Sequence, residues 1–415
     1  MPQFRPFKGI RPVREIAGNF STKGIDSFNS EELEKELNSN PNSFLHLIKP
    51  TWSSERIDVE ERQSRVRQNF VEFINSARAG QDRPSYYVYQ LIKPNNEQVK
   101  ALIGLVSLED YKEGKIKKHE ETLSKRVKRF ANYLKEVHFH AEPVLLTYPY
   151  TQRVDLLMEV EMKRKATVSF KDEQDNEHQL WQIENRLNLQ QIKSSIEKYD
   201  AFYIADGHHR MESSLEYTEE MKKEMEEEND NDPIHFTMAM LVSDRELIIK
   251  DYNRLIKDLN GLSKEEFLEK LGENFDISER GGNPFFPSKK HHLGLYIGGE
   301  FFSLFVKKDY LINDGLSLLD TYLFEELVLK PFLDIQDSRT DNRLRYIRGT
   351  GNVEGVNRIK MKVDKGLYSA GFFFYPVSSK DLETIADLNL KMPPKSTYIE
   401  PKPLTGLTIF QLKEE

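Results

Sequence analysis

Cysteine is absent from this chain of 415 residues. Disulfide bonds, thiol catalysis and metal sites built on cysteine are therefore excluded. The chain also lacks any apolar run near the roughly 18 residues that a membrane-spanning helix needs. Its first residues lack the continuous apolar core of a signal peptide. These absences predict a cytoplasmic protein with no membrane partner.

An excess of positive charge is also missing. The chain has 60 Lys and Arg residues against 68 Asp and Glu residues, which gives a formal net charge of −8. This balance argues against broad binding to a phosphate backbone, so we expect no nucleic-acid partner. The sequence contains no Gly-rich loop ending in GK[ST], which argues against a Walker-type nucleotidase.

What the chain does contain is typical of a folded protein. Hydrophobic residues make up 38% and aromatic residues 11%, which is too apolar for a disordered chain. The length allows two or three domains, and the mixture of strand and helix patterns predicts an α+β (mixed α/β) fold. An acidic tract at Glu219–Asp232 predicts a solvated helix end and linker. We therefore expect one α+β region at residues 1–228 and a second at 233–415, whose tail returns to the site.

Hydrophobic periodicity predicts most of the local elements. The expected strands are Tyr86–Ile92, Ala101–Leu108, Val144–Tyr148, Ala201–Ala205 and His235–Ser243, with hairpins at Ala166–Ile183 and at Leu293–Ile297 with Glu300–Val306. The expected helices are Val59–Ala77, Lys117 to Val137, Leu189–Lys198, Ser263–Gly272 and Leu316–Leu329. Ser263 and Glu266 have the spacing of a capping box.

The run Asp206-Gly207-His208-His209-Arg210 carries the most chemical information. It follows an apolar strand and opens a helix, and its glycine permits a sharp turn or the close approach of a ligand. A helix start with two imidazoles and a guanidinium suits a phosphate or a carboxylate. Asp206 suits a general base or a hard metal ion. The alternative is an ordinary capped helix at a domain surface.

Two further clusters have weaker signals. His119 and Glu120 lie in a charged segment that we interpret as a helix start, which on its own is also typical of solvated surface. The second cluster is Met392–Thr397, where two prolines fix a bend before Lys395, Ser396 and Thr397. Together with Lys402, these side chains make a plausible oxyanion cradle, and the alternative is a tail laid on the surface.

These three clusters, in their order along the chain, resemble the bacterial family called domain of unknown function 1015. The resemblance covers nearly the whole chain. Besides the three clusters it includes the segments Phe7–Pro12, Asn42–His46, Tyr252–Arg254, Pro401-Lys402 and Thr405–Leu407. At Ala17–Ser21 the chain departs from the Ala-Pro-Pro-Tyr-Asp-like segment that is frequent in the family.

The segment Asp206–Arg210 also resembles the corresponding motif of the ParB/sulfiredoxin-like free L-serine kinases. This resemblance implies a ParB-like core with an inserted hairpin and an additional C-terminal α+β region. By the same resemblance, Glu120 matches the carboxylate that acts on the serine hydroxyl, and Asp206–Arg210 matches the phosphate and metal corner. Much of the chain outside this core has no counterpart in a compact serine kinase.

The resulting hypothesis is a phosphotransferase that interconverts L-serine and O-phospho-L-serine, with ATP, ADP or another phosphate donor or acceptor as cosubstrate. Its predicted catalytic residues are Glu120, Asp206, His208 and His209, with Asp206 also holding Mg²⁺. Its predicted phosphate-binding residues are His119, Arg210, Arg254, Lys395, Ser396, Thr397 and Lys402.

Two other classes of function stay open. One is a metal-dependent hydrolase of a small phosphorylated metabolite, which would use the histidines and Asp206. The other is a non-catalytic, nucleotide-responsive ParB-like regulatory protein. His138 and His140 are interpreted as structural because no third zinc ligand is evident. The direction of the reaction and the oligomeric state are left open.

Overall fold

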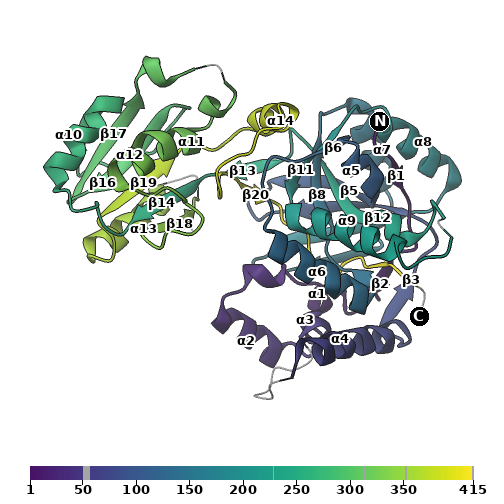
Figure 1. Cartoon of the computed structure of the whole chain (residues 1–415). Helices are drawn as coiled ribbons and strands as arrows, with labels where there is room; N and C mark the ends of the chain where they lie inside the picture. Colours follow the sequence, from purple (N-terminus) through teal and green to yellow (C-terminus); the bar gives the residue numbers. More distant parts are fainter. Residues whose placement is uncertain (50–56, 228, 313, 351–352, 414–415) are drawn as a thin grey trace. The chain divides into compact units, whose positions relative to one another are not determined.

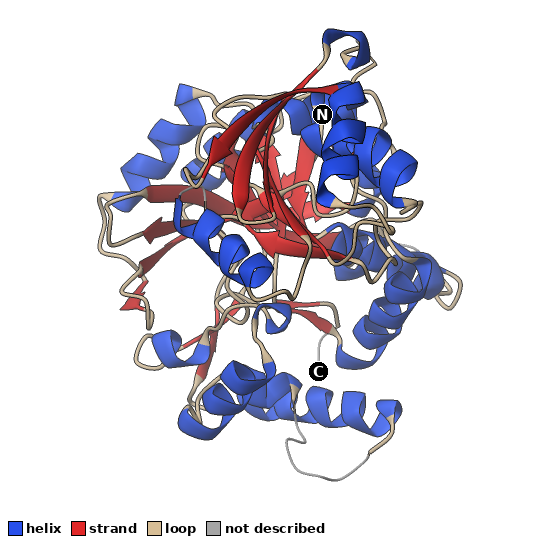
Figure 2. Ribbon diagram, turned by 90° about the vertical axis from the view of Figure 1, so that its left-hand side faces the viewer, coloured by secondary structure: helices blue, strands red, loops and turns tan. Residues whose placement is uncertain are grey.

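The computed structural model describes residues 1–49, 57–227, 229–312, 314–350 and 353–413. The chain divides into two compact units. Unit 1 comprises residues 1–117, 121–247 and 401–415, and unit 2 comprises residues 118–120 and 248–400. Helices and strands occur in both units (Figures 1 and 2), so the predicted α+β fold is confirmed. Among the described residues, no helix combines the length and the apolar character needed to span a bilayer.

The units differ from the division expected at residues 228–233. Strand β12 (Phe236–Ser243) pairs in parallel with β8 (Val144–Tyr148) and antiparallel with β5 (Gln98–Ser107). Every residue of β12 is buried, as expected for an inner strand covered on both faces. The acidic tract is therefore followed by a strand of unit 1, and the chain enters unit 2 only after Leu247.

Unit 1 is built on a nine-stranded mixed sheet. Its strands in spatial order are β6 (Ile116–Lys117), β11 (Phe202–Asp206), β8, β12, β5, β4 (Tyr86–Ile92), β10 (Glu177–Ile183) and β9 (Val168–Lys171), with β1 (Phe4–Arg5) also paired to β5. The expected hairpin at Ala166–Ile183 is formed by β9 and β10. Because β11 lies next to the edge strand β6, its carboxyl end delivers Asp206 near one edge of the sheet.

Helices of unit 1 cover this sheet and form a second small core. They are α1 (Ala17–Phe20), α2 (Ser30–Ser39), α3 (Leu45–Ile48), α4 (Val59–Ile74), α5 (Leu108–Lys112), α6 (Ser124–Val137), α7 (Gln152–Met162), α8 (Arg186–Ile196) and α9 (His208–Lys222). Helices α6 and α9 lie side by side (Figure 1). Apolar side chains of α7, α8 and α9 pack with those of the sheet strands, and the second core joins α1, α3 and α4 to the chain's last strand segment around Ile409.

The last residues of the chain complete unit 1. Strand β21 (Phe410–Gln411) pairs with β7 (Phe139–His140), and Ile409 forms a bridge with Ile10 of the short strand β2 (Ile10–Pro12), which also pairs with β3 (Ala79–Gln81). Thr405 forms a further antiparallel bridge with Thr22. The segment 401–413 is thus held to unit 1 along most of its length, which brings Lys402 into this unit.

Unit 2 contains a six-stranded antiparallel sheet. In spatial order the strands are β15 (Phe275–Gly281), β17 (Glu300–Val306), β16 (His292–Ile297), β19 (Ala370–Phe374), β14 (Tyr252–Ile256) and β18 (Leu344–Arg348). A separate ribbon pairs β13 (Ile248–Lys250) with β20 (Tyr398–Glu400). The expected glycine hairpin is formed by β16 and β17.

Two groups of helices bury the two faces of this second sheet. Helices α10 (Lys264–Asn274), α11 (Asp320–Phe324) and α12 (Lys330–Leu333) pack on one face, and α13 (Val353–Asp364) packs on the other. Helix α14 (Ser379–Asp387) precedes the loop that leads to β20. The predicted capping box of Ser263 and Glu266 is present at the start of α10. The predicted helix at Leu316–Leu329 is a 3₁₀ turn, α11 and a π-helical segment in succession.

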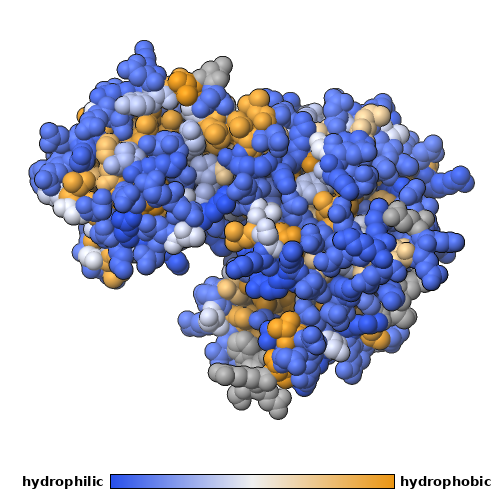
Figure 3. Space-filling view, in the orientation of Figure 1, coloured by the Kyte–Doolittle hydropathy of each residue, from blue (hydrophilic) through white to orange (hydrophobic). Residues whose placement is uncertain are grey.

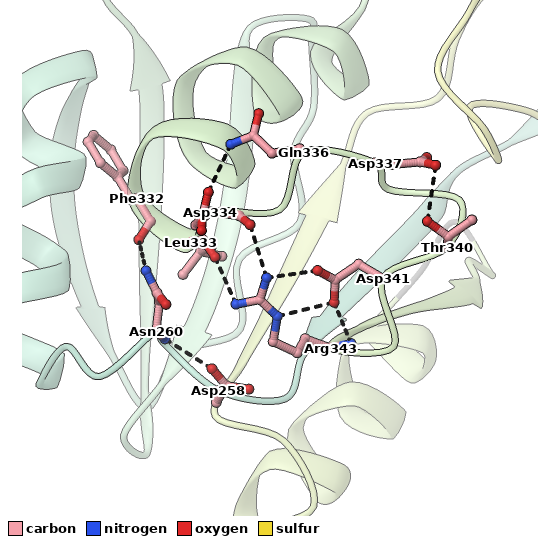
Figure 4. A network of polar contacts seen from close by, with 10 residues as sticks. All are labelled: Asp258, Asn260, Phe332, Leu333, Asp334, Gln336, Asp337, Thr340, Asp341 and Arg343. Carbon is pink, nitrogen blue, oxygen red and sulfur yellow. Dashed lines mark hydrogen bonds and ion pairs between the residues drawn. The ribbon is translucent and has the colours of Figure 1, made fainter.

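The entry to strand β18 is held by a polar network around Arg343 (Figure 4). The guanidinium donates to the carbonyl oxygens of Leu333 and Asp334, at 2.9 and 3.1 Å, and forms a two-point contact with the carboxylate of Asp341. Asp334 adopts a left-handed conformation with φ 51° at the end of α12. This arginine is thus occupied by its own loop and serves the fold.

The surface seen in Figure 3 is mostly hydrophilic, with apolar residues in scattered groups. This agrees with a mean hydropathy of −0.64 and with 31% charged residues. Scattered exposed apolar residues are normal on a folded protein.

Candidate functional site

The junction of β11 and α9 is a tight turn that only glycine adopts without strain. Residues 202–205 of β11 are buried, and the chain turns at Gly207 with φ 99° before α9 begins at His208. This is the left-handed region, which a side chain disfavours. A Cβ atom at position 207 would also stand 3.2 Å from the guanidinium carbon of Arg210. The turn therefore fixes both the backbone and the space for this arginine.

Asp206 holds two cations at this turn. Its Oδ2 atom lies 3.0 Å from Nη2 of Arg210, and its Oδ1 atom lies 2.9 Å from Nζ of Lys402. Arg210 is one helical turn further along the chain, whereas Lys402 arrives from the C-terminal segment of unit 1. The three side chains are 27–32% exposed, so the cluster is half-buried and keeps contact with solvent.

A second carboxylate, which the sequence did not single out, completes the contacts of Arg210. Oε1 of Glu142 lies 3.0 Å from Nη2 of Arg210, and Nη1 of the same guanidinium donates to the Pro143 carbonyl. The hydroxyl of Thr405 donates to the other carboxylate oxygen of Glu142 at 3.4 Å. The only local signal for Glu142 is its place before a proline at the start of a buried strand, and many surface glutamates share such a setting.

The two histidines of the motif have different surroundings. His208 is buried, with 4% of its surface exposed. His209 accepts a hydrogen bond at Nε2 from the backbone N–H of Leu123, at 3.1 Å, which assigns its proton to Nδ1. His209 therefore ties the segment before α6 to the first turn of α9.

A third histidine lies close to this cluster. His140 is buried, its ring stacks on Phe410, and its Nε2 atom has no hydrogen-bond partner among the described residues. Burial, with a smaller contribution from the positive charge of Arg210, lowers the pKa of His140 to about 4. The imidazole is therefore neutral at physiological pH.

Unit 2 brings the other two sequence clusters together. The segment with His119 and Glu120 is not a helix start as predicted, because α6 begins only at Ser124. Instead, the carbonyl of His119 accepts a hydrogen bond of 2.8 Å from the N–H of Met392. Nζ of Lys391 also donates to the Lys118 carbonyl, at 3.3 Å. These backbone contacts hold residues 118 and 119 beside the start of the Met392–Thr397 loop.

Within this loop only part of the predicted cradle faces outward. Lys395 is exposed and adopts a left-handed conformation with φ 55°. Ser396 is buried, and its hydroxyl contacts the Pro393 carbonyl and the hydroxyl of Thr321, both at 2.8 Å. Thr397 is half-buried. The Ser396 hydroxyl thus supports the loop, which leaves Lys395 as its exposed cation.

Arg254, which was predicted to bind phosphate, does not lie at the surface. It is 2% exposed, and its guanidinium lies 5.0 and 4.7 Å from the ring centroids of Tyr346 and Phe374. Its Nη2 atom donates to the carbonyl oxygens of Pro394 and Lys395, at 3.4 and 3.2 Å. Burial lowers the pKa of Arg254 to about 10. The guanidinium holds the loop from behind.

The predicted residues therefore form two groups, one in each unit. Unit 1 holds Asp206, Arg210 and Lys402 together, with the two motif histidines on the same helix start. Unit 2 holds His119 and Glu120 beside the loop of Lys395, with Arg254 behind it. Convergence of the two groups stays a prediction.

The contacts of Asp206 do not fit its predicted role as a magnesium ligand. Both of its oxygens already contact cations, and a third cation at the same place would be repelled. In the part of the chain that the structure describes, no group of three His, Asp or Glu side chains is arranged to hold a metal ion. The arrangement fits an anion better, because an anion can share the two cations with Asp206.

A pocket of about 490 Å³ lies elsewhere in unit 1, beside the C-terminal half of α9. Its lining is polar and includes Arg5, Lys112, Glu219 and His235. None of the predicted site residues lines it.

Comparison with solved structures finds distant similarities. A free serine kinase in complex with AMP aligns at 13% identity and a TM-score of 0.34, over 74% of this chain and 91% of that chain. SbnI with a C-terminal truncation, from Staphylococcus aureus, aligns at 11% identity and a TM-score of 0.39, over 75% and 87%. A conserved hypothetical protein from Pyrococcus furiosus aligns at 12% identity and a TM-score of 0.32, over 74% and 94%.

A comparison with curated proteins finds no match. The model of one protein family, described as protein of unknown function (DUF1015), matches residues 4–327. This match spans most of the chain, and it agrees with the resemblance carried by the sequence motifs. The chain therefore belongs to the DUF1015 family.

Proposed function

We propose that this protein is a phosphotransferase that interconverts L-serine and O-phospho-L-serine, with ATP, ADP or another phosphate compound as cosubstrate. The observation that carries the proposal is the pair of cations, Arg210 and Lys402, held on one carboxylate at the start of α9. The choice of serine follows the resemblance of Asp206–Arg210 to the motif of free L-serine kinases.

Phosphoryl transfer depends mainly on positioning and on neutralising the charge of the transferring group. Arg210 offers a planar fork that can bind two phosphate oxygens, and Lys402 offers a compact ammonium beside it. The first N–H groups of a helix point toward its N-terminal end and favour an anion there. In this proposal Asp206 and Glu142 keep the two cations in place until a phosphate group shares them.

The reaction also needs a group that removes the serine hydroxyl proton. In the kinase direction, the serine oxygen attacks the terminal phosphorus of the donor, and the bond between that phosphorus and the donor oxygen breaks. We assign the proton to the carboxylate of Glu120, which returns it in the reverse direction. A bound Mg²⁺ would supply further charge neutralisation, and no step assigned here to the protein's residues depends on it.

The proposal is tested by radiolabelled phosphate exchange on the full chain. L-serine or O-phospho-L-serine is incubated with ATP, ADP or pyrophosphate, with and without Mg²⁺. We expect exchange with at least one combination, and Lys402→Gln and Arg210→Lys should weaken it. Lys413→Gln is the matched control, because Lys413 is an exposed lysine of the same terminal segment. If well-folded protein turns over no combination, the proposed function is wrong.

A further inference from the structure

Two exposed cations of unit 2 lie on a pair of tyrosine rings. The ammonium of Lys395 lies 5.8 Å from the ring centroid of Tyr252, and the guanidinium of Arg348 lies 5.0 Å from that of Tyr398. The two rings are in edge-to-face contact, with 5.7 Å between their centroids. Because the rings touch each other, the two cations lie on adjoining side chains. Cations over aromatic faces are attracted by the ring quadrupole.

The strand register shows why these residues share a face. Tyr252 of β14 lies directly opposite Arg348 of β18, and Arg254 lies opposite Tyr346. Side chains two residues apart on a strand point to the same side of the sheet. Tyrosine and arginine therefore alternate across this strand pair, from the buried Arg254 to the exposed Arg348.

The charges of the exposed pair are not compensated by neighbouring carboxylates. Among the described residues, neither Lys395 nor Arg348 forms an ion pair. The negative charges of Asp251 and Glu325 attract the buried guanidinium of Arg254. Glu400 forms an ion pair with Lys250 at 2.8 Å. Two cations without an ion-pair partner, each on one of two adjoining rings, attract an anion.

The backbone that carries Lys395 is also fixed in advance. Arg254 donates to the carbonyl oxygens of Pro394 and Lys395, and Ser396 closes the loop through its hydroxyl. A non-glycine residue at φ 55° costs conformational energy, so the surrounding contacts must hold it there. On the other side, Gly349 lets the chain after Arg348 lie directly on the Asp251 carboxylate, where any Cβ atom would clash. The backbone next to each exposed cation is thus in contact with buried side chains.

We propose that Lys395 and Arg348 form a binding site for a phosphate group, with Tyr252 and Tyr398 as its base and Arg254 as the residue that positions the loop. The inference deepens the proposed function, on which the choice of phosphate rests, and it adds Arg348 to the residues that contact the phosphate of a substrate. A phosphotransferase binds a phosphate-bearing donor and a phosphate-bearing product. A second pair of cations, besides Arg210 and Lys402, meets this need.

The experiment measures binding to the full chain by isothermal titration calorimetry. The probes are O-phospho-L-serine, ADP, inorganic phosphate and L-serine. The test variant is Arg348→Gln, and the matched control is Arg345→Gln. Arg345 is an exposed arginine of the same strand whose side chain lies on the opposite face of the sheet, so the change in net charge is identical. Arg348→Lys keeps the charge and tests for partial rescue, and thermal unfolding checks that each variant is folded.

For at least one phosphate-bearing probe, we expect Arg348→Gln to weaken binding about ten-fold or more, since a hydrogen bond to a charged group is lost. Arg345→Gln should change it less than about two-fold, which is the range of general charge effects. Equal effects of the two variants would overturn the proposal. An equal loss for L-serine, which has a carboxylate but no phosphate, would also overturn it. Binding of no probe by the wild-type chain would do the same.

These outcomes are independent of turnover. If Arg348→Gln weakens phosphate binding but no exchange reaction is found, the binding site stands and the proposed reaction fails. If exchange occurs and the two arginine variants bind alike, the reaction stands and this site fails.

Discussion

Arg210 and Arg254 both donate to backbone carbonyls, but they differ in what they can do. Arg254 is 2% exposed, so a change of partners there would leave buried carbonyl groups without donors. The Arg210 side chain is 27% exposed and contacts two carboxylates at 3.0 Å. A half-buried ion pair in contact with water can exchange one partner for a ligand at much lower cost. This difference is why we place phosphate at Arg210 and assign Arg254 to positioning.

Replacement of Glu120 tests the proposed chemistry without a large effect on stability. Glu120→Gln keeps the size of the side chain and removes the base, so turnover should fall about 10²–10⁴-fold while thermal unfolding is little changed. The measurement is the initial rate of phosphate exchange. Glu121→Gln is the matched control, because Glu121 is the adjacent and more exposed carboxylate. Turnover that survives Glu120→Gln would leave the substrate class intact and remove Glu120 from the mechanism.

His140 makes stability depend on pH in a defined window. The pKa of His140 is lowered from 6.5 to about 4 in the folded protein, so between these values the unfolded chain takes up a proton that the folded chain does not. The free energy of unfolding should therefore decrease as pH falls from 6.5 toward 4. Below pH 4, His140 should cause no further change. Between pH 7.5 and 5.0, the free energy of unfolding should fall by about 2 kcal/mol more in the wild type than in His140→Gln.

The measurement for His140 is urea unfolding of both proteins at the two pH values. His46→Gln is a control substitution at a half-buried histidine near the surface. An equal loss of stability in wild type and His140→Gln would show that His140 does not titrate in this window.

At the scale of single elements, sequence patterns predicted those features that depend only on residues close together in the chain. The hairpin of β16 and β17 and the capping box at Ser263 depend on residues close in sequence, and both are present. The helix expected from Lys117 was wrong at its start, because the backbone of His119 is taken by Met392, which is distant in sequence. Glu142 was missed for the same reason, since only folding brings it to Arg210. Sequence patterns located the charged clusters but not their partners.

The β11–α9 turn makes a prediction at this scale. Gly207→Ala should destabilise the protein by about 1–2 kcal/mol, because alanine is strained in the left-handed region. It should also weaken phosphate binding, since the new Cβ atom presses on the Arg210 guanidinium. Gly114→Ala is the matched control: Gly114 has φ 78°, and a Cβ atom there meets nothing within 4 Å. Denaturant unfolding should show a similar loss in both variants, and calorimetry should show weaker binding only in Gly207→Ala. Equal binding by the two variants would contradict a role for this turn in placing Arg210.

At the scale of the whole molecule, unit 1 is assembled from segments that the chain separates widely. Unit 2 is inserted after Leu247, and the chain returns to unit 1 at Pro401. The order of motifs along the sequence could suggest a returning tail, but it could not show which side chain the tail delivers. Lys402 reaches Asp206 only because the residues after it are anchored in the core of unit 1.

Deletion of residues 401–415 should therefore unfold unit 1 selectively. The described part of the deleted segment contributes the buried aliphatic and aromatic side chains of Leu407, Ile409, Phe410 and Leu412. At about 1.5–3 kcal/mol for each, their loss is comparable with the whole stability of a typical domain. Hydrogen exchange should show lost protection in β8 and β12 of unit 1 and retained protection in β16 and β17 of unit 2. Lys402→Gln is the control that removes only the contact with Asp206, so it should leave protection in both units unchanged while weakening phosphate binding. Full protection of β8 and β12 after the deletion would mean that unit 1 folds without its last segment, and that Lys402 is delivered by a tail the core does not need.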